Sequence, residues 1–122
     1  MSEGVFFFDT YAFFEILRKN PSYEKYVGAR PITTIFNLAE LNHGLKRDGK
    51  KYADEMTRKN EASLVEVGVE DVIHAIDFRL KFKSRNVSIP DSIGYVVAKR
   101  HGTLFLTGDQ AFKDLPNVEF VK

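Results

Sequence analysis

Short apolar runs recur along the chain, and between them lie longer segments in which apolar residues are spaced three or four positions apart. Short runs bounded by Gly, Pro or polar residues are typical of buried strands. The stretch 63–67 is also assigned to a strand, because its apolar and polar residues alternate. The pattern therefore predicts strands over Val5–Phe8, Pro31–Thr33, Ser63–Val67, Thr103–Thr107 and Val118–Val121.

The intervening segments have the apolar spacing of helices. We predict helices over Thr10–Lys19, Pro21–Val27, Thr34–Arg47, Lys50–Asn60, Glu70–Ser84 and Pro90–His101. Stop signals support several of these ends, namely Asn20-Pro21, Asp48-Gly49 and Gly102. Strands that alternate with helices indicate βαβ units and a sheet covered on both faces. The expected fold class is α/β, a three-layer α/β/α sandwich around a central, mainly parallel sheet.

Composition limits the classes of protein that fit. A length of 122 residues is enough for one domain with a substantial core, so residues 1–122 are treated as a single domain. A net charge of +1 gives no global basic field, so any nucleic-acid surface must be local. The absence of cysteine excludes disulfides, thiolate metal sites and cysteine nucleophiles.

The N-terminal apolar stretch does not read as a targeting segment. It is interrupted by Asp9 and Glu15 and no basic region precedes it, so it is a poor match to a signal peptide. No stretch approaches the roughly eighteen apolar residues of a membrane-spanning helix. The sequence therefore predicts a cytoplasmic protein without a membrane segment.

Acidic residues follow two of the predicted strands. Asp9 comes directly after Val5–Phe8, and Asp109 lies just past Thr103–Thr107. A carboxylate at the end of a buried strand is costly unless something binds it. In open parallel sheets, ligands bind outside the carboxyl ends of the strands. If both strands belong to one sheet, these two carboxylates lie at the same edge.

Glu40 is a third candidate. On a helical wheel of 34–47 it lies opposite the apolar stripe, on a small polar face with Asn37 and Gly44. Such a face suits a surface that borders a site. The alternative is that Glu40 is an ordinary solvated helix residue.

Asp91 is the fourth candidate and lies in the first turn of the helix that begins at Pro90. It shares a face with Gly94 and Ala98, whose small size allows close packing and would hold the acid near a neighbouring element. The alternative is an acid that merely stabilises the helix dipole.

The four acids are more informative together. Crowded carboxylates repel one another, and a hard divalent cation relieves that repulsion. Ligation by oxygen alone suits Mg²⁺, or Mn²⁺ in its place, and does not suit zinc. Such a site activates water and stabilises an in-line displacement at phosphorus.

Four segments resemble motifs of the PIN-domain family. In chain order they are FFFDT (6–10), NLAEL (37–41), IPDSIGYVVAKRHG (89–102) and LFLTGDQAF (104–112). Their order and spacing match the family over essentially the whole chain. Within the family, the compact length is similar to the VapC-type toxin ribonucleases of prokaryotic toxin–antitoxin modules.

The resemblance implies a fold, an activity and partners. It implies a PIN-like α/β/α domain, Mg²⁺- or Mn²⁺-dependent cleavage of RNA that leaves a 5′-phosphate and a 3′-hydroxyl, a homodimer, and inhibition by a cognate antitoxin protein. The metal-binding acids implied position by position are Asp9, Glu40, Asp91 and Asp109. Thr10 and Thr107 match the hydroxyl positions that bind the acids or metal-bound waters.

Two positions depart from the family pattern. Tyr11 replaces a small polar residue, and Ala111 stands where many members carry another acid, for which Asp114 is the nearest substitute. The change at 111 keeps open the alternative of a PIN-like module that binds RNA or protein without cleaving it. Tyr11 also argues against haloacid-dehalogenase-type phosphatases, which need a second Asp at that position.

Contacts to RNA must come from local basic residues. Three groups are candidates: Lys46, Arg47, Lys50 and Lys51; Arg79, Lys81, Lys83 and Arg85; and Lys99, Arg100 and His101. The histidines at 43, 74 and 101 lack the spacing of metal ligands and are assigned structural or surface roles. The aromatic helix over 10–19 is either buried against the sheet or partly exposed as a groove for an antitoxin or a second subunit.

Overall fold

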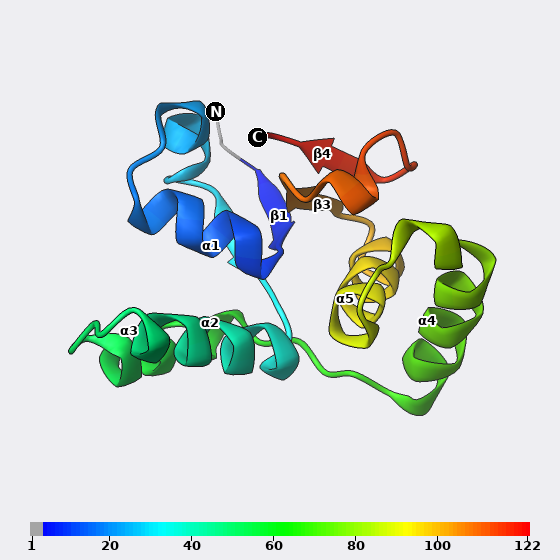
Figure 1. The fold of residues 1–122 in the computed structure, drawn as a ribbon, viewed down its shortest axis with the longest axis horizontal. Helices are drawn as coiled ribbons and strands as arrows, with labels where there is room; N and C mark the ends of the chain where they lie inside the picture. Colours follow the sequence, from blue (N-terminus) through cyan, green and yellow to red (C-terminus); the bar gives the residue numbers. More distant parts are fainter. Residues whose placement is uncertain (1–3) are drawn as a thin grey trace.

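A computed structural model of the protein describes residues 4–122, and its centre is a four-stranded sheet (Figure 1). The strands are β1 (Val5–Phe8), β2 (Arg30–Ile32), β3 (Leu104–Thr107) and β4 (Val118–Phe120). They run in the order β2-β1-β3-β4, and every neighbouring pair is parallel. The predicted parallel sheet is confirmed, and β1 and β3 are adjacent within it.

Within residues 4–122, five α-helices surround the sheet. They are α1 (Thr10–Leu17), α2 (Ile35–Arg47), α3 (Ala53–Lys59), α4 (Val69–Lys81) and α5 (Ile89–Arg100). Short 3₁₀ turns occupy Pro21–Tyr26, Glu61–Ser63, Lys83–Arg85 and Gln110–Phe112. The predicted helices are therefore present, although the segment after α1 is a 3₁₀ turn and α3 and α4 are shorter than expected. None of the helices within residues 4–122 is long and apolar enough to cross a membrane.

The strand predicted over Ser63–Val67 is wrong. Residues 61–63 form a 3₁₀ turn, and beyond it Leu64 makes only a single bridge, to Thr33. The reason lies in the partner strand. β2 ends at Ile32 and Thr34 already caps α2, so no extended backbone remains for further pairing.

The core has two halves because neighbouring side chains of β1 point to opposite faces of the sheet. Phe8 packs with residues of α1, α2 and the 21–26 turn, whereas Phe7 packs with residues of α4 and α5. Figure 1 shows these two groups of helices on either side of the strands. The three-layer α/β/α arrangement is thus confirmed. In α1, Ala12 and Phe13 are buried in the first half of the core, which favours the buried interpretation of this aromatic helix.

Candidate active site

Two predicted acids lie at one edge of the sheet. The last paired residues of β1 and β3 are Phe8 and Leu106, so Asp9 and Thr107 follow at the same level. Asp9 also caps the start of α1, because its side chain accepts a hydrogen bond from the backbone N–H of Thr10. The site therefore begins where the sheet and α1 meet.

The Asp9 carboxylate is only 3% exposed, yet it is well bound. Oδ2 accepts a hydrogen bond from the Thr107 hydroxyl at 2.6 Å, and Oδ1 accepts one from the Thr10 backbone at 2.9 Å. Burial, followed by the charge of nearby Asp91, raises the pKa of Asp9 well above its ordinary value, and the hydrogen bonds oppose this rise only in part. Without a cation, this carboxyl group therefore keeps its proton to a higher pH than an ordinary aspartate does.

Glu40 is held by a chain of hydrogen bonds that begins in the core. The Thr34 hydroxyl donates to Asn37 Oδ1 at 2.7 Å, and Asn37 Nδ2 donates to the Thr10 hydroxyl at 3.1 Å. That hydroxyl in turn donates to Glu40 Oε1 at 2.9 Å. Asn37 is completely buried, so the chain is anchored rigidly. Glu40 is therefore oriented toward the sheet edge and is not an ordinary solvated residue.

Asp91 reaches the same edge from the first turn of α5. Ser88 caps this helix and accepts a hydrogen bond from the Asp91 backbone N–H. Burial, followed by the charge of Glu40, raises the pKa of Asp91 to about 6. One turn further on, a Cβ at Gly94 would lie 3.1 Å from the Phe7 ring, so α5 packs directly against the sheet. The small face beneath Asp91 thus brings the acid close to its neighbours.

Asp109 completes the group from the loop after β3. Its backbone N–H donates to the Thr107 hydroxyl at 3.1 Å, and its Oδ1 accepts from the Ala111 backbone at 2.9 Å. A Cβ at Gly108 would overlap both the Val121 carbonyl oxygen and the Tyr11 ring. The chain between Thr107 and Asp109 is therefore pressed into the core.

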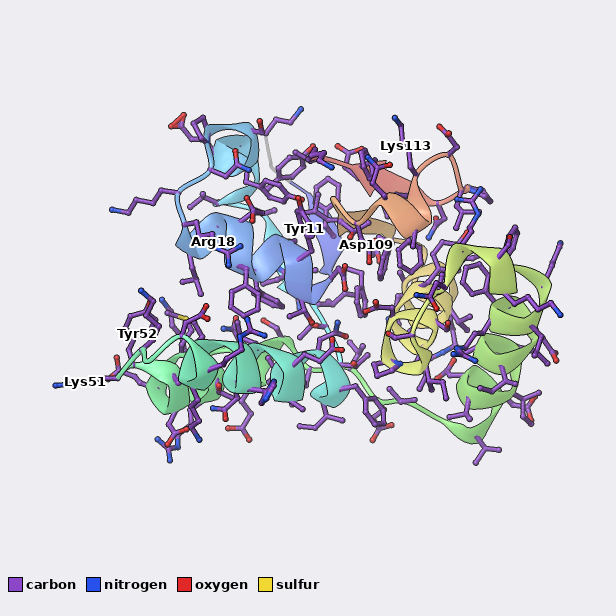
Figure 2. The ribbon with its side chains drawn as sticks, in the orientation of Figure 1. Tyr11, Arg18, Lys51, Tyr52, Asp109 and Lys113 are labelled. Carbon is purple, nitrogen blue, oxygen red and sulfur yellow. The ribbon has the colours of Figure 1, made fainter. Side chains whose placement is uncertain are left out.

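All four acids line one cleft of about 350 Å³, which we call the acid cleft. Its lining residues are Asp9, Thr10, Tyr11, Phe14, Glu40, His43, Gly44, Arg47, Asp91 and Asp109. Figure 2 shows Tyr11 beside Asp109 at this edge, whereas Lys51 lies at the far end of the α2–α3 pair. Thr107 contacts the cleft through Asp9. Asp114, the suggested substitute acid, is not among the lining residues.

The four carboxylates that line the acid cleft, alongside His43, are oxygen donors of the kind that hard cations prefer. Within residues 4–122, however, no three acidic, histidine or cysteine side chains converge closely enough to form a metal site as they stand. Three of the carboxylates already accept hydrogen bonds: Asp9 from Thr107 and the Thr10 backbone, Glu40 from the Thr10 hydroxyl, and Asp109 from the Ala111 backbone. The residues fit a divalent cation in their chemistry and charge, and they lie around a common space without meeting at one point.

The cleft also contains His43, to which the sequence assigned a structural or surface role, and Arg47, one member of the predicted basic groups. His43 and Arg47 follow Glu40 by three and seven positions, which places all of them on one face of α2. This spacing is a signal that sequence reasoning could have used. The hydrogen-bond chain through Asn37 was harder to predict from the sequence, because it joins residues from two separate segments.

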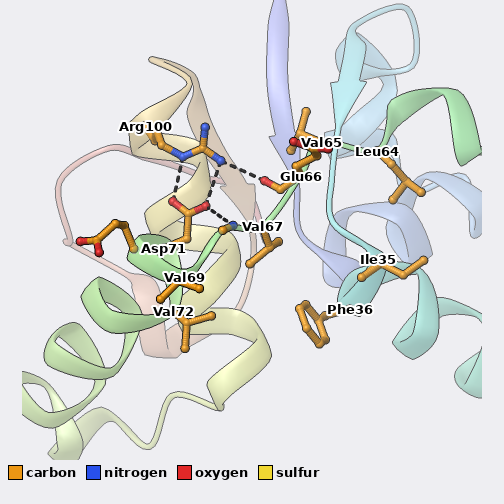
Figure 3. Close-up of a pocket in the computed structure, with 12 residues that line it drawn as sticks. Ile35, Phe36, Leu64, Val65, Glu66, Val67, Val69, Asp71, Val72 and Arg100 are labelled. Carbon is orange, nitrogen blue, oxygen red and sulfur yellow. Dashed lines mark hydrogen bonds and ion pairs between the residues drawn. The ribbon is translucent and has the colours of Figure 1, made fainter.

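A second and larger hollow, the apolar groove, holds about 1010 Å³ (Figure 3). It lies between the start of α2, with Ile35 and Phe36, and the start of α4, with Val69 and Val72. At one end Arg100 forms an ion pair with Asp71 at 2.8 Å. Its exposed apolar side chains were not predicted from the sequence as a surface.

Comparisons with known proteins give a consistent result. The family model for the PIN domain matches residues 6–118. One similar solved structure is a toxin–antitoxin complex from Klebsiella pneumoniae, with a TM-score of 0.75 and 17% identity over 93% of this chain and 95% of that chain. Another is VapBC2 from Rickettsia felis bound to a promoter DNA fragment, with a TM-score of 0.70 and 15% identity over 97% of this chain and 99% of that chain. At such identities the likeness shows a shared fold. No curated protein matches the sequence.

Proposed function

Because the chain belongs to the PIN-domain family, we propose that it is a divalent-metal-dependent endoribonuclease that hydrolyses RNA phosphodiester bonds. We further propose that it is the toxin of a type II toxin–antitoxin module and acts in the cytoplasm. One observation carries the catalytic proposal: the carboxylates of four separate segments line a single cleft. The role as a toxin is supported by the fold shared with chains of two toxin–antitoxin complexes.

Asp9, Glu40, Asp91 and Asp109 would hold the cation, which we propose to be Mg²⁺ with Mn²⁺ able to replace it. The chemistry that such an ion supplies when bound is activation of water and neutralisation of charge on the phosphate. The charge balance of the cleft supports this proposal. Burial and neighbouring carboxylates raise the pKa values of Asp9 and Asp91, so a proton or a cation is favoured beside these two acids.

The chain's own residues fix the positions of the reacting groups. Thr107 and the Thr10 backbone orient Asp9, and the Thr10 hydroxyl orients Glu40. In the proposed reaction, a carboxylate of the cleft orients a water molecule that attacks phosphorus in line with the departing 3′ oxygen. The bond to that oxygen breaks, and the products carry a 5′-phosphate and a 3′-hydroxyl.

The protein partners are part of the proposal. We expect a homodimer and a cognate antitoxin, and exposed apolar surface of the kind found in the apolar groove typically marks a protein interface. The two structural neighbours come from toxin–antitoxin complexes, which supports the expectation of an antitoxin.

Cleavage of RNA with Mg²⁺ or Mn²⁺ tests the catalytic proposal. Asp9→Asn should remove nearly all activity and leave the fold intact, because the amide oxygen can still accept from the Thr10 backbone while the amide NH2 donates to the Thr107 hydroxyl oxygen. Asp114→Asn is the matched control, since it makes the same chemical change at an acid outside the cleft lining. Full activity of Asp9→Asn with Mn²⁺ would refute the assignment.

The alternative is a PIN-like module that binds RNA or protein without cleavage. Two observations favour it: Ala111 replaces an acid, and the carboxylates do not converge on one point. Calorimetric titration with Mn²⁺ separates the two proposals. A nuclease should bind the ion and lose that binding in Asp91→Asn, whereas a pure binding module should give no Asp91-dependent heat.

A further inference from the structure

Arg47 is the one lysine or arginine that lines the acid cleft in the described part of the chain. It lies in the last turn of α2, seven residues after Glu40, which corresponds to about 10 Å along the helix axis at 1.5 Å per residue. Its side chain is 62% exposed, and its ion-pair contact is with the adjacent Asp48 at a long 3.4 Å. The guanidinium is therefore accessible to a ligand in the cleft.

Several other basic residues of the three predicted RNA-binding groups are held by contacts within the protein. Arg79 donates to the Val87 carbonyl, and Arg85 donates to the carbonyls of Ala111 and Lys113. Other cations are ion-paired on separate surfaces: Arg100 with Asp71, and Lys46 with Asp54 of α3. Arg47 differs from these residues because it borders the acids and its contact is weak.

The acid cleft thus has a negative end and a positive end. The largest influences on the pKa values of Asp9 and Asp91 are burial, neighbouring carboxylates and hydrogen bonds, and Arg47 is not among them. Between the two ends, Gly44 of α2 lies so close to Phe14 that a Cβ would overlap the ring. Gly44 and Phe14 therefore give the cleft lining an apolar part.

We propose that Arg47 binds a backbone phosphate of the RNA, at a nucleotide next to the scissile phosphate that the acids engage. This inference rests on the proposed ribonuclease function and adds a subsite to it. The planar guanidinium can bind two phosphate oxygens at once. A polyanion lying along α2 then has its reacting phosphate at the acid end and a neighbouring phosphate at Arg47. The contact sets the register of the chain in the cleft.

Binding is tested in the Asp9→Asn background, where cleavage does not interfere. The probe is a labelled single-stranded RNA oligonucleotide, titrated over a series of salt concentrations in Mg²⁺. Arg47→Gln should weaken binding about 10-fold and reduce the slope of log K against log salt by about 0.7, the value for one phosphate contact on a single strand. Arg47→Lys should keep most of the slope, because it keeps the charge.

Arg58→Gln is the matched control, since Arg58 is also an exposed arginine in the last turn of a helix and lies outside the cleft lining. It should change binding less than 2-fold. In the cleaving protein, Arg47→Gln should raise KM about 10-fold and leave kcat within 2-fold, because the contact is equal in ground and transition states. A fall in kcat at constant KM would overturn the proposal by placing Arg47 on the scissile phosphate.

Failure of this inference is distinct from failure of the proposed function. If the wild-type protein cleaves no RNA with Mg²⁺ or Mn²⁺, the function itself is refuted. If it cleaves RNA in an Asp9-dependent manner, and Arg47→Gln and Arg58→Gln have equal salt slopes, the function stands and only the subsite is refuted.

Discussion

The acid cleft encloses about 350 Å³ and the apolar groove about 1010 Å³, and their side chains are placed in opposite ways. In the cleft, polar groups such as Asp9 are buried and bound by hydrogen bonds. In the groove, apolar groups such as Val69 and Phe36 are exposed. Neither arrangement is favoured by folding alone. The difference supports the two kinds of ligand proposed above, a cation with a polyanion in the cleft and a protein in the groove.

One aspartate in each region, half-buried Asp91 and buried Asp71, makes the comparison specific. Asp91 faces other carboxylates in the cleft, and its pKa is raised to about 6. Asp71 lines the groove and is hydrogen-bonded to Arg100, which lowers its pKa. The charge of Asp71 is therefore compensated by Arg100, whereas the carboxylates beside Asp91 disfavour its charge.

The largest expected effect comes from replacing these two aspartates in turn. Asp91→Asn should reduce ribonuclease activity more than about 100-fold, since even partners of metal ligands contribute 10- to 100-fold. In EDTA at pH 7.5 the same variant should unfold at a higher temperature than wild type, because it removes an uncompensated charge. Asp71→Asn should keep activity and lose about 1–3 kcal/mol of stability with its ion pair. Parallel cleavage assays and thermal melts measure both, and equal signs of the two melting shifts would contradict the comparison.

Glycines of the two regions should differ next most strongly. Gly108→Ala forces a methyl group against the Val121 carbonyl and should cost about 1–3 kcal/mol by overpacking. Gly68, beside the groove, leaves a Cβ at an ordinary 3.8 Å from Asp71, so Gly68→Ala should cost less than about 1 kcal/mol. Urea unfolding of both variants measures the difference. A Gly108→Ala protein as stable as Gly68→Ala would show that the cleft loop is not pressed into the core.

The pH dependence of stability should reveal the same contrast. Folded Asp91 keeps its proton up to about pH 6, whereas the unfolded chain loses it near pH 3.9. Between these values the folded state binds more protons, so the free energy of unfolding falls as pH rises. The raised pKa of Asp9 lowers the free energy of unfolding with rising pH in the same way. Asp71, whose pKa is lowered, already contributes its full stabilisation above about pH 4.

We expect a loss on the order of 2 kcal/mol between pH 4.5 and 7 in EDTA, measured by urea unfolding in small pH steps. Mg²⁺ or Mn²⁺ should reduce this loss, because the ion replaces the proton in the cleft. The loss should also shrink in Asp91→Asn. A stability that rises over this range in EDTA would contradict the pKa values assigned to the cleft.

Sequence reasoning reached the cleft more easily than the groove, and the reason is physical. Strand ends and helix starts fix the direction of Asp9, Asp91 and Asp109, so local patterns place them at one edge of a parallel sheet. The groove arises from how α2 and α4 are spaced by the segment 60–68, within which the sequence wrongly predicts a strand over Ser63–Val67. That spacing is set by long-range packing, which local patterns do not reveal. In the sequence alone, exposed Val69 cannot be told apart from a valine of the core.

The apolar groove should give the smallest change in stability and still a clear change in association. Val69 is 75% exposed, so Val69→Ser removes little buried surface and should alter the free energy of unfolding by no more than about 0.5 kcal/mol. If the groove is covered by a second copy of the chain, Val69→Ser combined with Phe36→Ser should shift the protein toward the monomer in light scattering. Glu55→Ser and Arg58→Ser, two exposed changes on α3, form the control. If the groove variant associates as wild type does, a second copy does not cover the groove. The antitoxin is then the expected partner there, and co-purification with it should weaken in the same variant, because it would cover the same apolar side chains.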